Sequence, residues 1–503
     1  MMNVLVLDVG TSNMRGILFR ESGEKIASAQ EKYRVTCMPN GWVEQEASDW
    51  EQAMFRILHR IGELLSEHDW RVDAIALTSQ RSSVIALDRE WKPIQPAIMW
   101  QDKRTAEICH RFAGYNDLFL SRCGVRINSV FTAPKMRWIR ENQPEIYQKT
   151  EKFAVIPDYL LWKLTGKLQT DTTYGSRSLL MNLQEKCWDS ELLDLWGIEK
   201  EKLCDLIPSG SVAGTLTDSY AKRIGFPAGI PVITAGGDQQ CGAIGQGAFE
   251  RGRVALTAGT GGFLVAATDQ IPEDLGRSGM TCNCSSFMGQ YVLEGTMLTC
   301  CSAFDWFCRM FYPEYDLDEI NRIIDQTAAG ANDVLCLPYF LGRGTPDWND
   351  AARGVFTNIS LDTKKEDFLR ALIESICCEF ANEMQALREH VSADEVYVNG
   401  GLSNSHVFDQ ILCDTLELPV TRMGDADATA RGAFLVACKA MEPELDLANF
   451  YEKIGNTSER IKFLPDPGKG IQYQKRRNEM NNWYQQNYGV LLQERRAGGL
   501  SGN

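Results

Sequence analysis

The sequence VLVLDVGTS at residues 4–12 decides the fold, because a similar pattern, VALTAGTGG, returns at residues 254–262, half the chain further on. Each copy is an apolar strand that runs into a tight turn containing Gly-Thr. A second apolar strand follows each turn, at residues 15–19 and 263–265. Repetition at half the chain length predicts an internal duplication, in which each half carries one strand–turn–strand hairpin.

The chemistry of these turns favours the binding of phosphate groups. Glycine lets backbone N–H groups converge on an anion, and threonine adds a hydroxyl. Only the first copy carries an acidic residue, Asp8, whose carboxylate is available to bind a hard cation. Either copy alone would be typical of an ordinary β-hairpin. Two such hairpins facing each other across a cleft would hold the phosphates of a nucleotide, so the repeat predicts ATP chemistry.

The composition is that of an acidic globular protein. At 503 residues the chain is too long for one core and predicts two large domains. No apolar run approaches the ~20 residues that span a bilayer, and the N-terminus lacks a basic segment before an apolar one. We therefore expect a cytoplasmic protein. The net charge of −15 argues against nucleic acid and anionic membrane surfaces as partners.

The 16 cysteines favour neither a metal site nor a disulfide framework. No CxxC pair recurs at zinc-finger spacing, and only 5 histidines could act as further ligands. Free cysteine packs as a small apolar side chain, so we expect reduced thiols in the core.

Strands and helices alternate in both halves. The first half predicts strands at 3–9, 14–20, 74–77 and 231–235, and a long helix from Ser48 through Leu65 with Ser48 and Asp49 as its N-cap. The second half predicts helices near 299–311 and 364–390, a strand at 395–398, and a final helix at 426–441. We expect a short hinge near 244–252 and an unstructured tail at 491–503.

This alternation indicates α/β domains, and the strand pair at the head of each half makes each sheet mixed. Loops at the carboxyl ends of the strands should line the cleft. The candidate residues in these loops are Arg81, Ser82, Asp238, Gln239, Gly400 and Gly401.

Asp238 is the sharpest single candidate for catalysis. It follows a buried strand and two glycines, so its carboxylate could accept a hydroxyl proton during phosphoryl transfer. The alternative is that Asp238 only caps the helix that begins at Gln239. The local sequence does not decide between these two roles.

An ordered set of motifs resembles the FGGY carbohydrate kinases over about residues 3–440. The segments GDQQ at 237–240 and GQG at 245–247 resemble the catalytic segment of that family, and DVGTS at 8–12 and AGTG at 258–261 resemble its two phosphate hairpins. Further segments agree in order and spacing. They are GWVEQ at 41–45, IMWQDKR at 98–104, FTAPKMRW at 131–138, the stretch 354–374, and GGLS at 400–403.

The resemblance implies ATP-dependent phosphorylation of a sugar or polyol hydroxyl between two actin-like ATPase (ribonuclease H-like) domains, each with a mixed sheet, that flank a catalytic cleft. The N-terminal domain, 1–246, would bind the sugar and carry the base, and the C-terminal domain, 247–490, would bind the nucleotide. The expected partner is a small sugar or polyol, and the expected cofactors are ATP and Mg²⁺. A homodimer is compatible with this picture.

The resemblance also assigns roles to single residues. Asp238 would be the general base, and Asp8 would act on Mg²⁺ through water. Residues around the nucleotide phosphates would be Thr11, Ser12, Asn13, Arg15, Thr260 and Gly261. Gly401 and Ser405 would approach the adenosine. Arg81, Ser82, Trp100, Asp238 and Gln239 would bind the substrate.

Two departures from the glycerol kinase pattern bear on the substrate. Those enzymes resemble this chain at Arg81 and Trp100, but they have an acid where this chain has Ser82 and an aromatic hydroxyl near Val130. Losing two polar groups removes hydrogen bonds that a small triol needs. The segments at 131–135 and 337–339 are similar to xylulokinases. We therefore expect a xylulokinase-like pentulose kinase, with glycerol kinase or a non-catalytic sugar- and ATP-binding regulator as alternatives.

Overall fold

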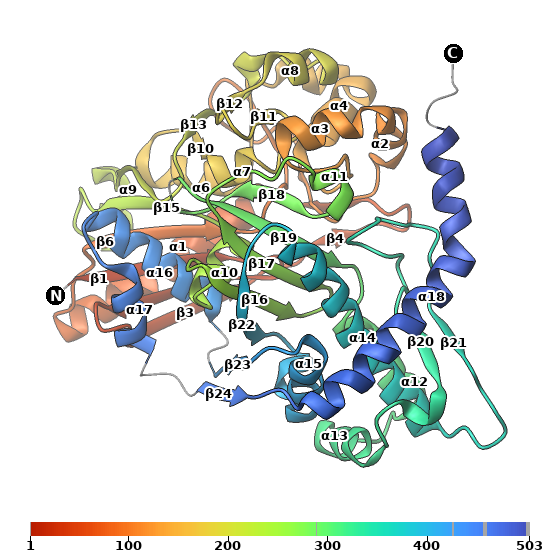
Figure 1. Cartoon of the computed structure of the whole chain (residues 1–503). Helices are drawn as coiled ribbons and strands as arrows, with labels where there is room; N and C mark the ends of the chain where they lie inside the picture. The colour runs from red at the N-terminus through yellow and green to blue at the C-terminus, as the bar shows by residue number, and fades with distance from the viewer. Residues whose placement is uncertain (1, 288, 425–426, 456–459, 499–503) are drawn as a thin grey trace.

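The fold contains two large mixed sheets, one in each half of the chain (Figure 1). The structure is a computed structural model, which describes residues 2–287, 289–424, 427–455 and 460–498. In space, the first sheet has the order β14 (Ser211–Thr215), β15 (Pro231–Gly237), β6 (Ala74–Ser79), β1 (Asn3–Val9), β2 (Asn13–Arg20) and β3 (Lys25–Lys32). The second has the order β18 (Thr281–Cys284), β19 (Tyr291–Met297), β17 (Gly262–Thr268), β16 (Gly252–Ala258), β22 (Ala393–Asn399), β23 (Val420–Met423) and β24 (Arg460–Phe463).

The two sheets share one connectivity, as the repeated hairpin predicts. In the first, β1 pairs antiparallel with β2 and parallel with β6, and β15 is parallel to β6. In the second, β16 pairs antiparallel with β17 and parallel with β22, which is parallel to β23. The carboxyl ends of β1 and β6 meet at one edge because they are parallel, and so do those of β16 and β22.

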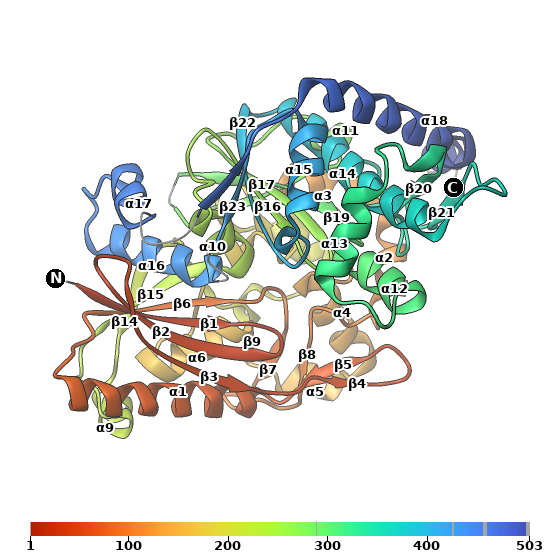
Figure 2. The same cartoon turned by 90° about the horizontal axis from the view of Figure 1, so that it is seen from below.

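Each sheet carries a long helix inserted at the same place in its strand order. The helix α1 (Ala47–His68) precedes β6, and α14 (Lys365–Arg388) precedes β22. Figure 2 shows α1 along the outer face of the first sheet. Its buried residues join Leu5, Leu7 and Val9 in one core cluster. The predicted N-cap is wrong, because the helix begins one residue before Ser48, with Glu46 as N-cap, directly after strand β5 (Val43–Gln45).

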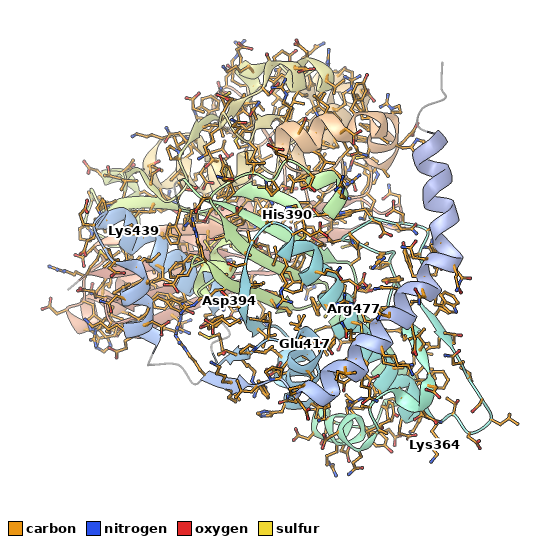
Figure 3. The ribbon with its side chains drawn as sticks, viewed as in Figure 1. Lys364, His390, Asp394, Glu417, Lys439 and Arg477 are labelled. Carbon is orange, nitrogen blue, oxygen red and sulfur yellow. The ribbon has the colours of Figure 1, made fainter. Side chains whose placement is uncertain are left out.

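The opposite face of the first sheet is covered from the second half of the chain. The helix α16 (Ala428–Met441) packs on β1, β6 and β15, and Phe434 stacks on Phe19 with ring centroids 5.0 Å apart. The helix α17 (Leu447–Gly455) adds Tyr451 and Ile454 to this cluster. In Figure 3, Lys439 of α16 lies among first-half elements, far from Arg477. The two halves therefore share a core.

A close helix crossing joins the halves. The helix α10 (Asp238–Gly245) packs against α16, and glycines from both helices stand at the crossing. A Cβ atom on Gly432 would lie 1.8 Å from the carbonyl oxygen of Cys241, and one on Gly245 would lie 1.9 Å from that of Ala428. Only glycine permits this approach of the two backbones.

The helix expected near 299–311 forms with a slightly later start, and further helices connect the strands. These helices include α2 (Ala106–Arg111), α4 (Thr132–Asn142), α6 (Ile156–Thr165), α8 (Ser190–Trp196), α12 (Cys301–Phe311) and α15 (His406–Leu416). Most of the 16 cysteines are buried, which confirms that they pack as small apolar side chains.

The C-terminal segment differs from the expectation. The helix at 426–441 is not the last, because α17 and α18 (Pro467–Gly498) follow it. The tail expected to be unstructured from residue 491 continues as helix to Gly498, and residues 499–503 lie outside the described part. The sequence at 490–497 is rich in strong helix formers and contains no proline, which explains the extension. Within the described residues, no helix is long and apolar enough to cross a membrane.

Candidate active site

The first hairpin turn is held closed by its neighbours. The N–H of Gly10 donates to the carbonyl of Asn13 over 2.9 Å. The hydroxyl of Tyr33 donates to the carbonyls of Gly10 and Asn13 over 2.5 and 2.9 Å. At the tip, Thr11 is half-buried and Ser12 is exposed. The turn is thus fixed from below while its tip stays open to a ligand.

Asp8 stands directly beneath this turn and is paired with Arg15. The two residues lie opposite each other in the β1–β2 register, with Arg15 Nη2 2.5 Å from Asp8 Oδ2. Arg15 also pairs with Asp427, which in turn lies 2.6 Å from Nζ of Lys25. Burial raises the pKa of Asp8, and the charge of Arg15 opposes this shift. A phosphate group at the turn would compete with two carboxylates for Arg15.

The second hairpin turn is braced by the start of α12. The carbonyl of Thr260 accepts hydrogen bonds from the N–H groups of Cys300 and Ser302, over 3.0 and 3.3 Å. The N–H of Gly259 donates to the carbonyl of Gly261 over 3.0 Å. Thr260 itself is exposed. This turn, like the first, is fixed by its carbonyls and leaves its tip accessible.

The loop after β22 packs directly against the second hairpin. Gly400 has φ +109°, and a Cβ atom there would lie 2.3 Å from the carbonyl oxygen of Ala258. A Cβ on Gly401 would lie 3.2 Å from Sγ of Cys301. The hydroxyl of Ser405 accepts the N–H of Phe408 over 3.2 Å as the N-cap of α15. Gly400 therefore lies against the end of β16 and Gly401 against the start of α12, while the Ser405 hydroxyl is engaged in capping α15.

Asp238 lies at the end of β15, as the first residue of α10. Its Oδ1 accepts the N–H of Gln239 over 2.8 Å and lies 3.7 Å from Nε of Arg81. Its side chain keeps 29% of its surface exposed. Burial raises the pKa of Asp238 to about 6; the charge of Arg81 opposes this shift and that of Asp8 adds to it. A carboxylate with this pKa is suited to accept a proton near neutral pH.

The structure adds two residues that the sequence reasoning missed. Glu294 of β19 lies 3.3 Å from Arg81 and 3.4 Å from Arg177, and its side chain is 3% exposed. Arg177 also lies over the ring of Phe131, 4.7 Å from its centroid. The available signal was the lone carboxylate in the apolar strand YVLEGTM at 291–297. Such a charge needs a partner when it is buried, but the sequence does not name one.

The other expected substrate residues lie nearby in the same half of the chain. Trp100 is 37% exposed, and its Nε1–H donates to Oγ1 of Thr11 over 3.3 Å. Gln239 is half-buried beside Asp238. Ser82 has φ +72° and is 2% exposed; its hydroxyl has no hydrogen-bond partner among the described residues. A left-handed backbone conformation is uncommon for serine, and the residues that adopt it are concentrated at functional sites.

A buried lysine shapes the neighbouring loop. Nζ of Lys135 donates to the carbonyls of Ser129, Val130 and Phe131 over 2.8, 2.7 and 2.9 Å. Burial lowers the pKa of Lys135 to about 7. The loop at 129–131 is therefore fixed by a single side chain, and it carries the ring that faces Arg177.

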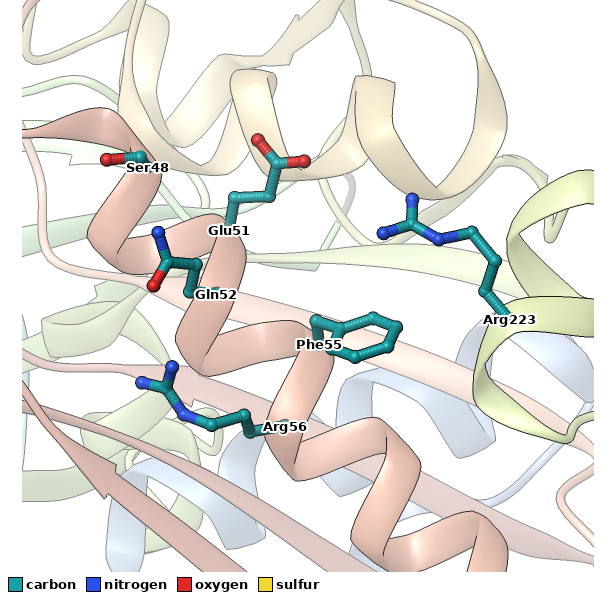
Figure 4. Close-up of a pocket in the computed structure, with 6 residues that line it drawn as sticks. All are labelled: Ser48, Glu51, Gln52, Phe55, Arg56 and Arg223. Atoms are coloured by element: carbon teal, nitrogen blue, oxygen red, sulfur yellow. The ribbon is translucent and has the colours of Figure 1, made fainter.

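A separate hollow on the surface of α1 takes no part in this arrangement (Figure 4). It is lined by Ser48, Glu51, Gln52, Phe55, Arg56 and Arg223. It lies on the outer helix of the first half, and none of the predicted site residues borders it. Its charged groups already have partners, since Arg56 pairs with Glu31, Glu51 pairs with Lys163, and Arg223 lies over Phe55 within the hollow. The candidate site remains the region around Asp238.

Comparison with known proteins shows the family. Residues 3–245 match the model of the N-terminal domain of the FGGY family of carbohydrate kinases, and residues 254–441 match that of its C-terminal domain. The chain belongs to this family. A glycerol kinase of Bacillus velezensis is 33% identical over 456 residues, which cover 86% of this chain and 89% of that protein.

Solved structures agree with this membership in their fold. The ligand-bound xylulose kinase of Lactobacillus acidophilus superposes with a TM-score of 0.89 at 24% identity, over 96% of this chain and 98% of that one. The glycerol kinase of Plasmodium falciparum with ADP superposes with a TM-score of 0.88 at 23% identity, with the same coverage. The two-domain FGGY kinase fold, with actin-like halves and mixed sheets, is thus confirmed.

Proposed function

We propose that this FGGY family member transfers the terminal phosphoryl group of ATP to a hydroxyl of a small sugar or polyol, with Asp238 as general base. The observation that carries this proposal is the carboxylate of Asp238 itself. It is partly exposed at the end of β15, its pKa is raised to about 6, and it lies beside Arg81. In the reaction, Asp238 accepts the hydroxyl proton, the oxygen bonds to phosphorus, and ADP leaves with the electron pair of the broken bond.

The two hairpins and the loop after β22 are the proposed nucleotide site. Thr11, Ser12 and Thr260 stand at or near accessible tips, where hydroxyl and backbone N–H groups suit phosphate oxygens. Gly261 follows Thr260, Gly401 lies against Cys301 and Ser405 caps α15, while Asn13 and Arg15 belong to β2 after the first turn. The ADP named in the Plasmodium falciparum structure supports a nucleotide for this fold.

We expect the carboxylate of Asp8 to bind Mg²⁺ through a water molecule. Among the described residues there is no cluster of three or more His, Cys, Asp or Glu side chains that could hold a metal alone. A single carboxylate, that of Asp8, fits Mg²⁺, because this ion is usually bound by one or two carboxylates together with substrate phosphates. When bound, the ion would neutralise charge on the phosphates. Asp8 would orient its water shell, and Arg15, which pairs with Asp8 and Asp427, would supply positive charge near the phosphates.

For the acceptor we propose a five-carbon ketose. Ser82 in place of an acid, and Val130 in place of a phenol, leave fewer polar groups than a small triol needs. Glycerol is the second candidate, because the Bacillus velezensis relative at 33% identity is a glycerol kinase. A regulator that binds sugar and ATP without turnover is the third, and the retained acids Asp8 and Asp238 weigh against it.

ADP release measured over a panel of acceptors tests these alternatives. The panel should contain xylulose, ribulose, xylitol, glycerol and gluconate, each with ATP and Mg²⁺, and an acceptor-free control for ATP hydrolysis. We expect the highest kcat/KM with a pentulose. If glycerol is the best acceptor, the interpretation of Ser82 and Val130 is wrong. If every acceptor gives only the control rate while calorimetry detects ATP binding, the regulatory alternative replaces the kinase.

A further inference from the structure

Glu294 is a buried carboxylate of the second half that contacts side chains of the first half. It belongs to β19, next to β17 of the second hairpin in the second sheet. Its side chain, however, contacts two arginines of the first half, Arg81 and Arg177, at 3.3 and 3.4 Å. Arg81 is in turn the residue beside Asp238. A single carboxylate thus connects the second sheet to the neighbour of the proposed base.

The charges in this cluster favour the ionised form of Glu294. Burial alone would raise its pKa, but the guanidinium groups of Arg81 and Arg177 outweigh burial and hold the pKa of Glu294 below its usual value. Arg177 is itself held at a pKa of about 10, because it is buried and is repelled by Arg81. Without Glu294, two buried like charges would face each other unscreened, which is costly.

Glu294 also fixes the direction in which Arg81 points. Both Nη1 and Nη2 of Arg81 lie 3.3 Å from Oε2 of Glu294, and Nη1 lies 3.4 Å from Oε1 of Gln240. These contacts engage the far end of the guanidinium and leave Nε as the group nearest Asp238, at 3.7 Å. Arg81 therefore sits beside Asp238 without a tight ion pair that would keep the base from taking a proton.

We propose that Glu294 is a positioning residue for phosphoryl transfer: supplied by the second half, it holds Arg81 in place beside Asp238 when the two halves are together. This inference rests on the proposed role of Asp238 as base. It makes the environment of the base depend on the second half, so that the site is complete only in the closed molecule. Closure of this kind also excludes water from the transfer.

The substitution Glu294→Gln tests this role, because it keeps the shape and removes the charge. The charged or titratable groups that face Asp238 come from several elements and the loops that follow them. They are Asp8 of β1, Arg81 after β6, Tyr174 and Arg177 in and after α7 (Thr172–Gly175), and Glu294 of β19. The charge of Glu294 raises the pKa of Asp238, so its removal moves the acidic limb of the kcat profile to lower pH.

We expect E294Q to lower kcat about 10- to 100-fold, since Arg81 is no longer held in place. Glu294→Asp should recover part of the loss, and KM for ATP should change little. The matched control is Glu383→Gln. Glu383 is another buried carboxyl of the second half; it lies against Gly295, and burial already raises its pKa well above normal. E383Q should therefore leave the pH profile unchanged.

Two readouts separate failure of this inference from failure of the proposed function. Small-angle X-ray scattering needs no turnover, and we expect E294Q, but not E383Q, to have a larger radius of gyration than the wild type. If the wild type is active and E294Q has the same kcat and the same pH profile, the positioning role is contradicted. If E294Q and E383Q lose the same fraction of kcat, and the acidic limb of the kcat profile lies at the same pH in both, Glu294 contributes to stability alone. An unchanged radius of gyration contradicts the link between the halves.

Discussion

Nε of Arg81 lies 3.7 Å from Oδ1 of Asp238, which is close enough for charge attraction but too long for a tight hydrogen bond. Burial nevertheless raises the pKa of Asp238 to about 6, against the effect of Arg81. The carboxylate is therefore ionised at neutral pH and still basic enough to accept a proton. Strong pairing with Arg81 would have lowered that basicity.

The first prediction concerns the pH dependence of the rate. Only the ionised form of Asp238 can act as base, so kcat should fall as pH drops through about 6, roughly tenfold for each unit below it. The measurement is kcat between pH 5 and 8, with ADP quantified chromatographically so that no coupling enzyme contributes its own pH dependence. A rate that stays flat across this range would contradict the assignment.

The same pKa makes a prediction about stability. The pKa of Asp238 is 3.8 in the unfolded reference and about 6 in the fold. The contribution of Asp238 to the free energy of unfolding is therefore fully present below pH 3.8 and is lost as the pH rises through 6. Asp238→Asn should accordingly raise Tm relative to the wild type at pH 8, and only about half as much at pH 5. Equal differences at both pH values would show that the carboxylate is not destabilised by burial.

The helix crossing between the halves gives a prediction with a matched control. Gly432→Ala places a Cβ 1.8 Å from the Cys241 carbonyl, so we expect a loss of about 1–3 kcal/mol in the free energy of unfolding. Gly242→Ala on the facing helix meets only Oγ1 of Thr429 at 3.5 Å and should be neutral or stabilising, by up to about 1 kcal/mol. Urea unfolding of both variants measures this difference, and similar values for the two would refute the close crossing.

Lys135 offers a test of the loop at 129–131. Lys135→Met leaves three carbonyls without their shared donor and should cost about 3 kcal/mol of stability. The loop carries Phe131, which packs on Arg177, so KM for the sugar should rise as well. Lys149→Met, at an exposed lysine ending α5 (Pro144–Lys149), controls for loss of charge. A Lys135→Met variant as stable as this control would show that the carbonyls do not depend on Lys135.

Much of the fold and the placement of most candidate residues could be predicted from the sequence, because they depend on local patterns. The hairpins at 4–12 and 254–262 predict the paired strands, and parallel strands bring Arg81 and Asp238 to one edge. The duplicated pattern also predicts the shared connectivity of the two sheets.

What the sequence could not predict depends on distant parts of the chain. Asp427 pairs with Arg15 across more than 400 residues, and Glu294 reaches Arg81 from the other sheet. No periodicity indicates which partner a buried charge will meet. The same holds for α16, whose small apolar residues predict burial but not that it covers the first sheet. The long helix α18 was missed because its polar sequence resembles a solvated tail.

The central claim is tested most directly by the activity of Asp238→Asn. Oδ1 of the asparagine can still accept the N–H of Gln239, so the helix start is preserved while the base is lost. We predict that kcat with the best acceptor falls at least about 100-fold, while calorimetry gives an unchanged Kd for ATP. A variant that keeps near-wild-type kcat would contradict the role of Asp238 as general base.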